Sequence, residues 1–394
     1  MSCSVSDYKN NVLTIYLEGT IDSTNASADE EKLIDIRKSH PAGTIILDCD
    51  RLEYISSAGL RVILRLKKEV DDTKLINVKP DIYDILDMTG FTEIMEVQKA
   101  YRVISVEGCE VIGKGANGKV YRIDPETILK VYFNPEALEE IQKERELCRA
   151  AFVMGIPTAI PYDVVLTENG DYGTVYELIN ANSFAKLIKK GLMTVDEVAE
   201  MSNNMLKLIQ AKTVDMNLFP NMKDIADGWV KDLKDYLSED IYQKLYQLVD
   251  GIPEDKHVVH GDFHLNNLMH QENEDLLIDM DTISYGHPIF DLTSMYNAYV
   301  GFGAVDHDVP MQFFGLDYET TNAFWKKSLQ LYLGTDDPER LQDVENKVKV
   351  LSCTRILRRT LRRYGKEDEK AQALINYCKA SLEDLVPKLD TLDF

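Results

Sequence analysis

The residues best suited to chemistry lie in one stretch, HGDFHLNNLMHQENEDLLIDMD, residues 260–281. It contains Asp262, then Asn267 five positions later, and an aspartate at the end of the apolar run LLID. A carboxylate can orient and deprotonate an acceptor hydroxyl, while an amide oxygen and a second carboxylate hold Mg²⁺ against nucleotide phosphates. The spacing therefore predicts the chemistry of phosphoryl transfer from Mg·ATP. The candidate catalytic residues here are Asp262 and Asn267, and the candidate metal ligands are Asn267, Asp279 and Asp281.

A glycine-rich pattern lies upstream, in CEVIGKGANGKVYRI at residues 109–123. A second β-type run follows it directly, and a third, TILKVYF, comes after a turn. This order is typical of a kinase lobe, whose loop N–H groups cover the phosphates, whereas a dinucleotide-binding fold needs a helix directly after the loop. Lys130 in the third run has apolar neighbours, which suits a cation that grips the α- and β-phosphates. The candidate nucleotide-binding residues in this part are Gly113, Gly115, Gly118, Val120 and Lys130.

Two further parts of a nucleotide site are expected downstream of the lysine. A helix predicted over residues 135–152 carries Glu144, which we expect to pair with Lys130 and hold its side chain in place. Beyond two more predicted strands, the chain reaches Glu177 and Ile179. We expect their backbone N–H and C=O groups to contact the edge of the adenine. The candidate catalytic set thus comprises Asp262, Asn267, Lys130 and Glu144.

His-Gly-Asp followed by Asn at this spacing, with IDMD and GHPIFD behind it, resembles the aminoglycoside phosphotransferase/choline kinase group. The resemblance implies an α+β bilobal protein-kinase-like domain over residues 107–394, with a small β-rich lobe (107–178) and a large helical lobe (179–394). It also implies a phosphotransferase with an alcohol group as acceptor, and ATP and Mg²⁺ as cofactors. In this pattern Asp291 either braces the catalytic loop from the helix that follows or simply caps that helix.

Residues 1–102 alternate strand and helix patterns, which predicts a layered α/β domain. The run TIILDCD is apolar throughout, as in a strand that is covered on both faces. Strands are expected at residues 12–19, 44–50, 73–78 and 93–97, and helices at residues 23–38, 60–70 and 80–88, the first of them capped by Ser23 or Thr24.

A pair of serines, Ser56 and Ser57, stands directly before the second of these helices. Either hydroxyl can cap the helix N-terminus. The same position can hold a phosphate, which free backbone N–H groups and the helix dipole stabilise and which changes the surface charge by nearly two units. The pattern is therefore compatible with both a structural cap and a phosphorylation switch.

Three pieces of this region, LEGTID, IILDCDRLEYISSAGLRVIL and GFTEIMEV, resemble a STAS domain, the fold of anti-sigma factor antagonists. The resemblance implies an α/β domain with a mixed sheet, and a binding module without catalytic chemistry of its own. It places the phosphorylation candidate on Ser57, two residues before Gly59. Ser56 stands where many members of the family carry Asp. A regulatory protein that binds the STAS domain is therefore a possible partner.

Charge and composition exclude several classes of partner. The 67 Asp and Glu against 44 Lys and Arg give a net charge of −23, which repels nucleic acid and anionic membranes, so we expect neither as a partner. The sequence starts without a signal-peptide core and contains no apolar run of membrane-spanning length. The six cysteines form no CxxC pair and are typical of reduced thiols, so we expect a cytoplasmic protein.

Five arginines stand at helical spacing near the C-terminus, which is notable in so acidic a chain. They can pair with the protein's own carboxylates. Alternatively, they line the acceptor site or a docking surface for an acidic or phosphorylated group. The five are Arg355, Arg358, Arg359, Arg362 and Arg363.

The acceptor is the least determined part of the hypothesis. Asp291 follows Asp279 by twelve positions, whereas kinases that phosphorylate peptides have a much longer segment there. This favours a small hydroxylated acceptor such as an amino alcohol, a sugar or an antibiotic. A regulatory Ser/Thr kinase acting on Ser57 of its own or a partner's STAS domain remains an alternative, as does a nucleotide-sensing partner-switch module with little turnover.

Overall fold

The computed structural model describes residues 2–115, 117–134, 136–271 and 274–394. The chain divides into two compact units, Met1–Val106 with Val164–Asp171, and Glu107–Asp163 with Tyr172–Phe394. The second unit contains every residue proposed for phosphoryl transfer, and the first contains Ser57. In the part of the chain that is described, no helix is long and apolar enough to cross a membrane.

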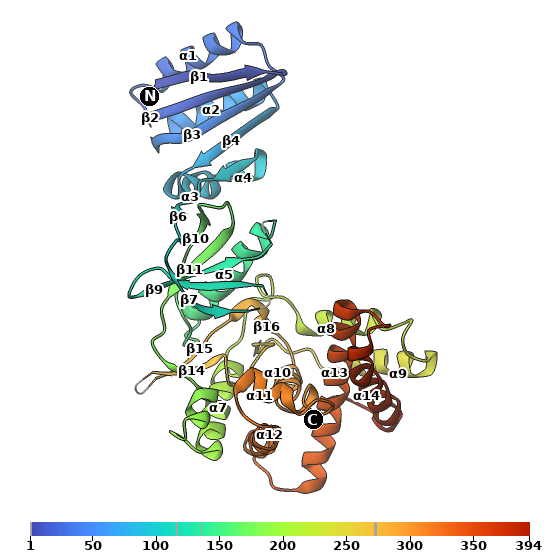
Figure 1. Cartoon of the computed structure of the whole chain (residues 1–394). Helices are drawn as coiled ribbons and strands as arrows, with labels where there is room; N and C mark the ends of the chain where they lie inside the picture. The colour runs from blue at the N-terminus through green and yellow to red at the C-terminus, as the bar shows by residue number, and fades with distance from the viewer. Residues whose placement is uncertain (1, 116, 135, 272–273) are drawn as a thin grey trace. The chain divides into compact units, whose positions relative to one another are not determined.

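The first unit is built on a five-stranded mixed sheet in the order β1-β2-β3-β4-β5 (Figure 1). β1 is antiparallel to β2, and the other neighbours are parallel. Alternate side chains of β2 and β3 are fully buried, as expected for central strands. The strands are β1 (Ser2–Lys9), β2 (Val12–Ile21), β3 (Thr44–Ile55), β4 (Asp72–Val78) and β5 (Val97–Lys99).

Four helices complete this α/β fold: α1 (Ala26–Ser39), α2 (Ser57–Glu69), α3 (Pro80–Met88) and α4 (Phe91–Ile94). The expected cap of α1 is wrong, because the N-cap is Asn25 and the Thr24 hydroxyl instead donates to Asp22. The strand expected at residues 93–97 was placed too early, because β5 begins only at Val97. Gly90, whose backbone is in the left-handed region, precedes α4, and this helix takes up the residues where the strand was expected to begin. β1 was not expected, since its residues are mostly polar.

The serine pair divides into two roles. The Ser56 Oγ accepts hydrogen bonds from the backbone N–H groups of Ala58 (3.2 Å) and Gly59 (3.5 Å), so Ser56 is the N-cap of α2. Ser57 is the first residue of the helix and is exposed. Gly59 packs so closely on Ile21 and Ile55 that a Cβ would collide with both side chains. The cap therefore leaves the hydroxyl of Ser57 available at the surface.

The small lobe of the second unit is an antiparallel ladder of β7 (Glu110–Lys114), β8 (Gly118–Arg122), β9 (Thr127–Tyr132) and β11 (Tyr172–Glu177). A long helix, α5 (Leu138–Val153), accompanies this sheet, and the expected helix start at residue 135 lies outside the described residues. In the first unit, β6 (Val103–Ile104) pairs in parallel with residues 166–167 of β10 (Pro161–Thr167). Three strands in succession around a glycine loop are the arrangement that the sequence predicted.

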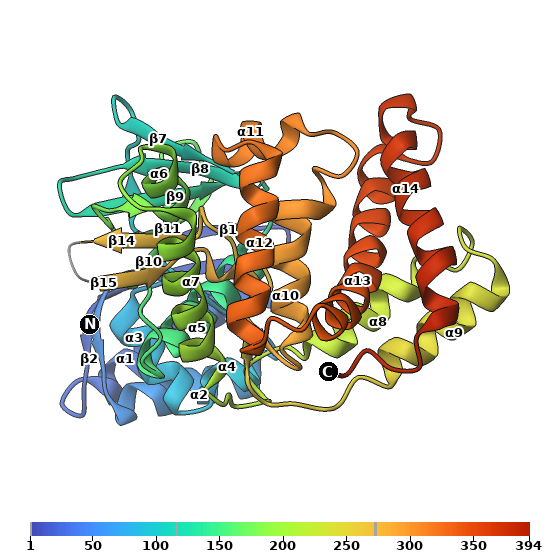
Figure 2. The same cartoon turned by 90° about the horizontal axis from the view of Figure 1, so that it is seen from below.

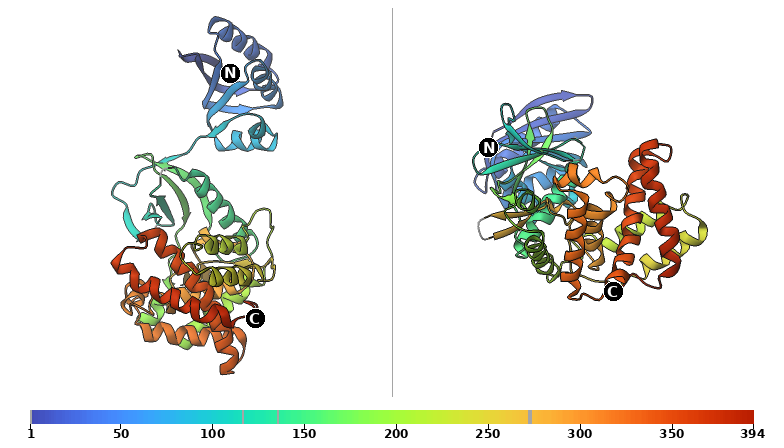
Figure 3. Two further views of the ribbon diagram at one scale, coloured as in Figure 1. Left: turned by 90° about the vertical axis from the view of Figure 1, so that its right-hand side faces the viewer. Right: turned by 60° about the horizontal axis from the view of Figure 1, so that its bottom comes forward.

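The large lobe is mainly helical, and α12 packs on α7 while α13 packs on both α10 and α14 (Figures 2 and 3). Thr194 and Glu197 form a capping box that starts α7, which is the local signal for a helix N-terminus. The helices are α6 (Phe184–Lys189), α7 (Val195–Gln210), α8 (Met222–Lys231), α9 (Glu239–Asp250), α10 (Ile289–Tyr296), α11 (Asp308–Phe314), α12 (Tyr318–Leu333), α13 (Pro338–Tyr364) and α14 (Glu369–Leu385). The short strands are β12 (Asn182–Ser183), β13 (Val258–Val259), β14 (Leu268–Gln271), β15 (Glu274–Leu277) and β16 (Ser284–Tyr285).

Candidate active site

β7 and β8 pair in an antiparallel arrangement on the two sides of the glycine loop. Gly113 faces Val120 in the ladder, and the N–H of Gly115 donates to the carbonyl oxygen of Gly118 at 3.0 Å. A Cβ on Gly115 would meet open space, whereas a Cβ on Gly118 would collide with the backbone carbonyl of Val131. The close approach of β8 and β9 therefore requires glycine at position 118. At position 115 the space that a side chain would fill is open.

This difference gives a pair of matched variants. Gly118→Ala should lower the free energy of unfolding by about 1–3 kcal/mol, because the added methyl group overpacks the β8–β9 ladder. Gly115→Ala should leave stability unchanged, since nothing lies near its Cβ. Urea unfolding of both variants measures this. Equal stability losses would contradict the packing argument.

Lys130 joins three elements. From β9, its Nζ donates to Glu144 Oε1 of α5 at 2.8 Å and to Asp279 Oδ1 at 3.1 Å. Tyr176 OH also donates to Glu144 Oε1, at 3.2 Å. The side chains of Lys130 and Glu144 are 17% and 11% exposed. Burial lowers the pKa of Lys130, but the carboxylates of Asp279 and Glu144 raise it well above its ordinary value, so the lysine is charged.

The structure places Glu144 beside Lys130, the pair that the sequence predicted, and adds Asp279, which was expected only as a metal ligand. The other glutamates in the first half of α5 and the later Glu146 are exposed. Tyr176 was missed by sequence reasoning. Tyr176 comes close to Glu144 only because β11 pairs with β9 in the register Thr174↔Lys130. A sequence alone does not give this register.

The catalytic loop is organised by the neutral imidazole of His260, which is fully buried. The backbone N–H of Asp262 donates to His260 Nδ1 at 3.2 Å, so the ring proton lies on Nε2, 3.3 Å from the carbonyl oxygen of Ile278. Burial lowers the pKa of His260 to about 4, although Asp262 acts in the opposite direction. His260 therefore shapes the loop and is uncharged at neutral pH.

The lowered pKa predicts a pH dependence of stability. Between pH 6.5 and about 4 the unfolded chain binds a proton at His260 that the folded chain does not, so the free energy of unfolding falls as the pH drops through this window. The loss should be about 3 kcal/mol at the low end. Urea unfolding at several pH values should show a shallower decline for His260→Asn. His307→Asn, at an exposed histidine, should keep the wild-type decline, and identical declines in all three proteins would contradict the assignment.

Hydrogen bonds hold both backbone polar groups of Gly261, its N–H and its carbonyl oxygen. Its N–H donates to Asp291 Oδ1 at 3.0 Å, and its carbonyl oxygen accepts from Arg355 Nη1 at 2.8 Å. Its φ is +79°, and a Cβ would lie 2.8 Å from the carbonyl oxygen of Thr282, so only glycine fits. Asp291 is fully buried and also accepts from Gln210 Nε2 at 3.1 Å; burial raises its pKa to about 6 against these hydrogen bonds. Asp291 is thus a brace of the catalytic loop.

Asp262 and Asn267 lie at the two ends of the same short loop. Asn267 Nδ2 donates to the backbone carbonyl oxygen of Asp262 at 3.0 Å, and His264 Nε2 lies 3.4 Å from Asp262 Oδ2. Burial raises the pKa of Asp262, but His264 and the positive charge of Arg355 outweigh it and hold this pKa well below its ordinary value. The Asp262 carboxylate is therefore ionised and partly exposed.

The surroundings of Asp279 and Asp281 fit a divalent cation. Burial and the neighbouring charge of Asp279 raise the pKa of Asp281 to about 7. Carboxylates of this kind are the hard oxygen ligands that Mg²⁺ prefers, and the backbone carbonyl oxygen of Asn267 accepts from the N–H of Ile278, next to Asp279. Among the described residues, no three His, Cys, Asp or Glu side chains form a metal site by themselves.

The connection between the lobes has its own pattern of hydrogen bonds. The N–H of Glu177 donates to the carbonyl oxygen of Ile160 at 3.1 Å, and the N–H of Leu178 donates to that of Glu126 at 2.7 Å. No backbone acceptor is found for the N–H of Ile179 within the described residues. Of the two residues predicted to contact adenine, Ile179 is therefore the one able to offer an N–H.

Comparison with known proteins gives separate matches for the N-terminal part of the chain and for the part that follows it. The model of the STAS domain matches residues 6–104, and that of the phosphotransferase enzyme family matches residues 108–324. A protein of Bordetella bronchiseptica named "Putative anti-sigma factor antagonist BtrV" is 33% identical over 90 residues, which are 22% of this chain and 77% of that protein.

Solved structures similar to the chain are those of aminoglycoside phosphotransferases. The ADP-bound crystal structure of APH(2'')-Ib is 17% identical, with a TM-score of 0.48, covering 78% of this chain and 98% of that one. The streptomycin–ATP–APH(2'')-IIa ternary complex is 18% identical, with a TM-score of 0.47, covering 78% and 97%. Because the phosphotransferase match spans more than half of the 394 residues, the chain belongs to the phosphotransferase enzyme family, and a STAS domain precedes its family domain.

Proposed function

We propose that this protein transfers the γ-phosphate of ATP to a hydroxyl group of a small molecule, and that its STAS domain regulates this activity or binds a partner. The observation that carries the proposal is Lys130, which contacts Glu144 and Asp279 at the same time, from strand, helix and the turn after β15. Such an arrangement holds a cation where nucleotide phosphates bind in kinases. Membership of the phosphotransferase family supports the same reaction class.

In the proposed reaction, Asp262 orients the acceptor hydroxyl and accepts its proton as the new P–O bond forms. Its low pKa makes it a weak base, which suits a transition state in which the proton leaves late. The clamp on Gly261 by Asp291 and Arg355 keeps the Asp262 backbone in one position. Positioning of this kind is the main protein contribution to phosphoryl transfer.

The proposed nucleotide site uses the loop of Gly113, Gly115 and Gly118 over the phosphates, with Val120 beneath it on β8. Lys130 binds the α- and β-phosphates. Ile179 offers its N–H to the adenine, and Glu177 lies at the same lobe connection. Mg²⁺, when bound, would neutralise charge between the β- and γ-phosphates. Asn267, Asp279 and Asp281 are its proposed ligands.

The short connection after Asp279 supports a small acceptor. A 3₁₀ turn (Met280–Thr282) and β16 lead directly into α10 at Ile289, and β16 pairs with β13. The chain therefore has no room here for the extended platform on which protein kinases bind peptides.

A second candidate function is phosphorylation of Ser57, on the same chain or on a partner's STAS domain. The exposed Ser57 hydroxyl at the start of α2 favours it, because the adjacent N-cap is already provided by Ser56. A phosphate at this helix N-terminus would be stabilised by the dipole. The name of the Bordetella relative also points to partner switching through such a domain.

Release of ADP from Mg·ATP, measured with and without sugars, amino alcohols and hydroxy acids, tests the proposal. We expect turnover that rises with one acceptor class and yields a product heavier by one phosphoryl group. Turnover that no small alcohol changes, accompanied by phosphate on Ser57, would favour the second candidate.

A further inference from the structure

The arginines of α13 mostly do not pair with the protein's own carboxylates. Arg358 Nε donates to Asp232 Oδ2 at 2.6 Å, but Arg355 donates to a backbone carbonyl group. Arg359 lies over the ring of Phe302. Within the described part of the chain, no carboxylate lies within ion-pair distance of Arg359, Arg362 or Arg363. Internal ion pairs therefore do not explain why a protein with a net charge of −23 has this row of arginines on α13.

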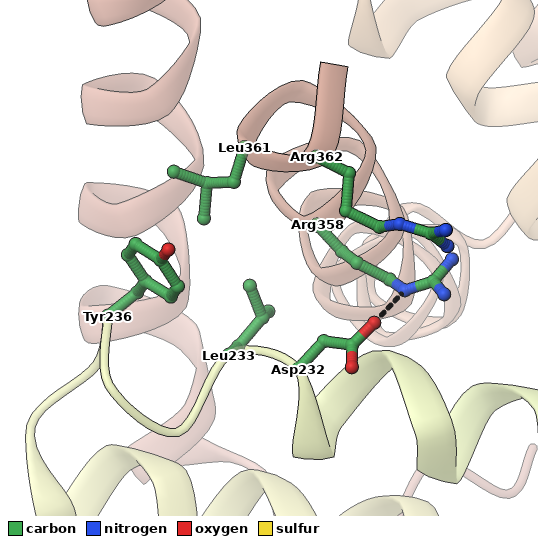
Figure 4. A pocket seen from close by; sticks show the side chains of 6 residues that line it. All are labelled: Asp232, Leu233, Tyr236, Arg358, Leu361 and Arg362. Carbon is green, nitrogen blue, oxygen red and sulfur yellow. Dashed lines mark hydrogen bonds and ion pairs between the residues drawn. The ribbon is translucent and has the colours of Figure 1, made fainter. Parts of the chain in front are cut away.

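Two of these arginines line a cavity of about 540 Å³ between α13 and the end of α8 (Figure 4). Its apolar floor consists of Leu233 and Leu361, which are buried. The guanidinium groups of Arg358 and Arg362 lie side by side at its edge. The lining residues are Asp232, Leu233, Tyr236, Arg358, Leu361 and Arg362.

The charges of this cavity do not balance. Two guanidinium groups face a single carboxylate, that of Asp232, and Arg358 and Arg362 are like charges at i and i+4, which repel each other. The nearby Asp227 on α8 is paired with Lys231 at 2.5 Å. An anion held by both guanidinium groups would remove the repulsion and gain charge-assisted hydrogen bonds.

Arg355, on the same face of α13 as these two arginines, contacts both the catalytic loop and α8. Arg355 bonds to Gly261 and stacks on Trp229 of α8, with 5.3 Å from its Cζ to the ring centroid. Arg358 and Arg362 follow Arg355 at i+3 and i+7, on the same face of α13, and roughly 5 Å and 10 Å further along its axis. The cavity and the catalytic loop therefore lie along the same face of α13, with Arg355 between them.

We infer that the acceptor is an anionic hydroxylated small molecule, a phosphate monoester or a carboxylate. Its charged group binds Arg358 and Arg362, its uncharged body lies against Tyr236 and Leu361, and its hydroxyl group reaches Asp262. Cationic amino compounds are disfavoured here, because they would meet two guanidinium groups. This inference rests on the proposed function, since it names the substrate class of the same site.

Binding of ribose 5-phosphate and of ribose to the full chain tests the anion site directly. Isothermal titration calorimetry is performed with a saturating non-hydrolysable ATP analogue and Mg²⁺, so that the nucleotide site cannot take the sugar phosphate. We expect ribose 5-phosphate to bind at least about tenfold more tightly than ribose, and Arg362→Gln to remove that advantage. Asp232→Asn should instead strengthen binding of the phosphate, because it removes a negative charge from the lining of the cavity. Arg363→Gln, outside the cavity, is the matched control and should change nothing.

Equal affinities for ribose and ribose 5-phosphate would overturn the inference, and so would equal losses in Arg362→Gln and Arg363→Gln. A peptide of residues 50–64 phosphorylated on Ser57 serves as a second probe. If it binds more than tenfold more tightly than ribose 5-phosphate, the cavity is a protein-docking site and the small-molecule inference is wrong. Failure of the proposed function is seen separately, as ADP release that does not depend on Asp262.

Discussion

Asp262→Asn should lower kcat by about 10²–10⁴-fold, while the affinity for ATP stays unchanged. The carboxylate of Asp262 is kept ionised by His264 and Arg355, and an amide in its place cannot accept the hydroxyl proton. The loop itself should persist, because Asn267 and His260 bind the backbone of Asp262 and not its side chain. Acceptor-dependent ADP release gives kcat, and calorimetric titration with ATP gives the affinity.

Asp275→Asn is the matched control for that variant. Asp275 lies on β15 and binds His270 Nδ1 at 2.7 Å, so the same loss of one carboxylate occurs outside the site. Its kcat should equal that of the wild type. If Asp262→Asn turned over at the wild-type rate, the role given to Asp262 would be wrong.

Lys130→Met should both abolish turnover and destabilise the protein. Removing the ammonium group leaves Glu144, which is 11% exposed, without its cation, and such a break of a buried pair costs about 3 kcal/mol. The loss of its contact to the nucleotide phosphates should lower kcat at least about 100-fold. Urea unfolding and ADP release measure the two effects on the same protein.

The double variant Lys130→Met/Glu144→Gln separates the two effects. A neutral glutamine can still accept the hydrogen bond of Tyr176, so most of the lost stability should return, but turnover should not. Glu146→Gln, at an exposed position of α5, should change neither quantity. Recovery of activity in the double variant would show that Lys130 acts only through the fold.

The sequence predicted those parts of the molecule that depend on local pattern. The glycine hairpin, Lys130 in the third strand and the helix with Glu144 follow from strand and helix periodicity and from the order of the motifs. The STAS-like alternation of strands and helices was predictable for the same reason. Ser56 as a cap also follows from its place before α2.

Other parts depend on contacts between distant segments, which local pattern does not encode. Gln210 reaches Asp291 across 81 positions, and Arg355 reaches Gly261 across 94. From the sequence, Arg355 stands out only as one of five arginines at helical spacing, and Gln210 has no evident role. The start of the last strand of the first unit was wrong because α4, a helix of four residues, is too short to show a helical period.

The destination of the γ-phosphate tests the central claim most directly. Wild type and Asp262→Asn are incubated with Mg²⁺, labelled ATP and a mixture of hydroxylated phosphate monoesters and carboxylates, and the label is followed into small molecules, into the protein and into inorganic phosphate. We expect label in a small-molecule ester with the wild type and none with Asp262→Asn, and no label on the protein. Label on Ser57 would show that the protein phosphorylates a STAS domain, and label released only as inorganic phosphate in both proteins would contradict a phosphotransferase that uses Asp262.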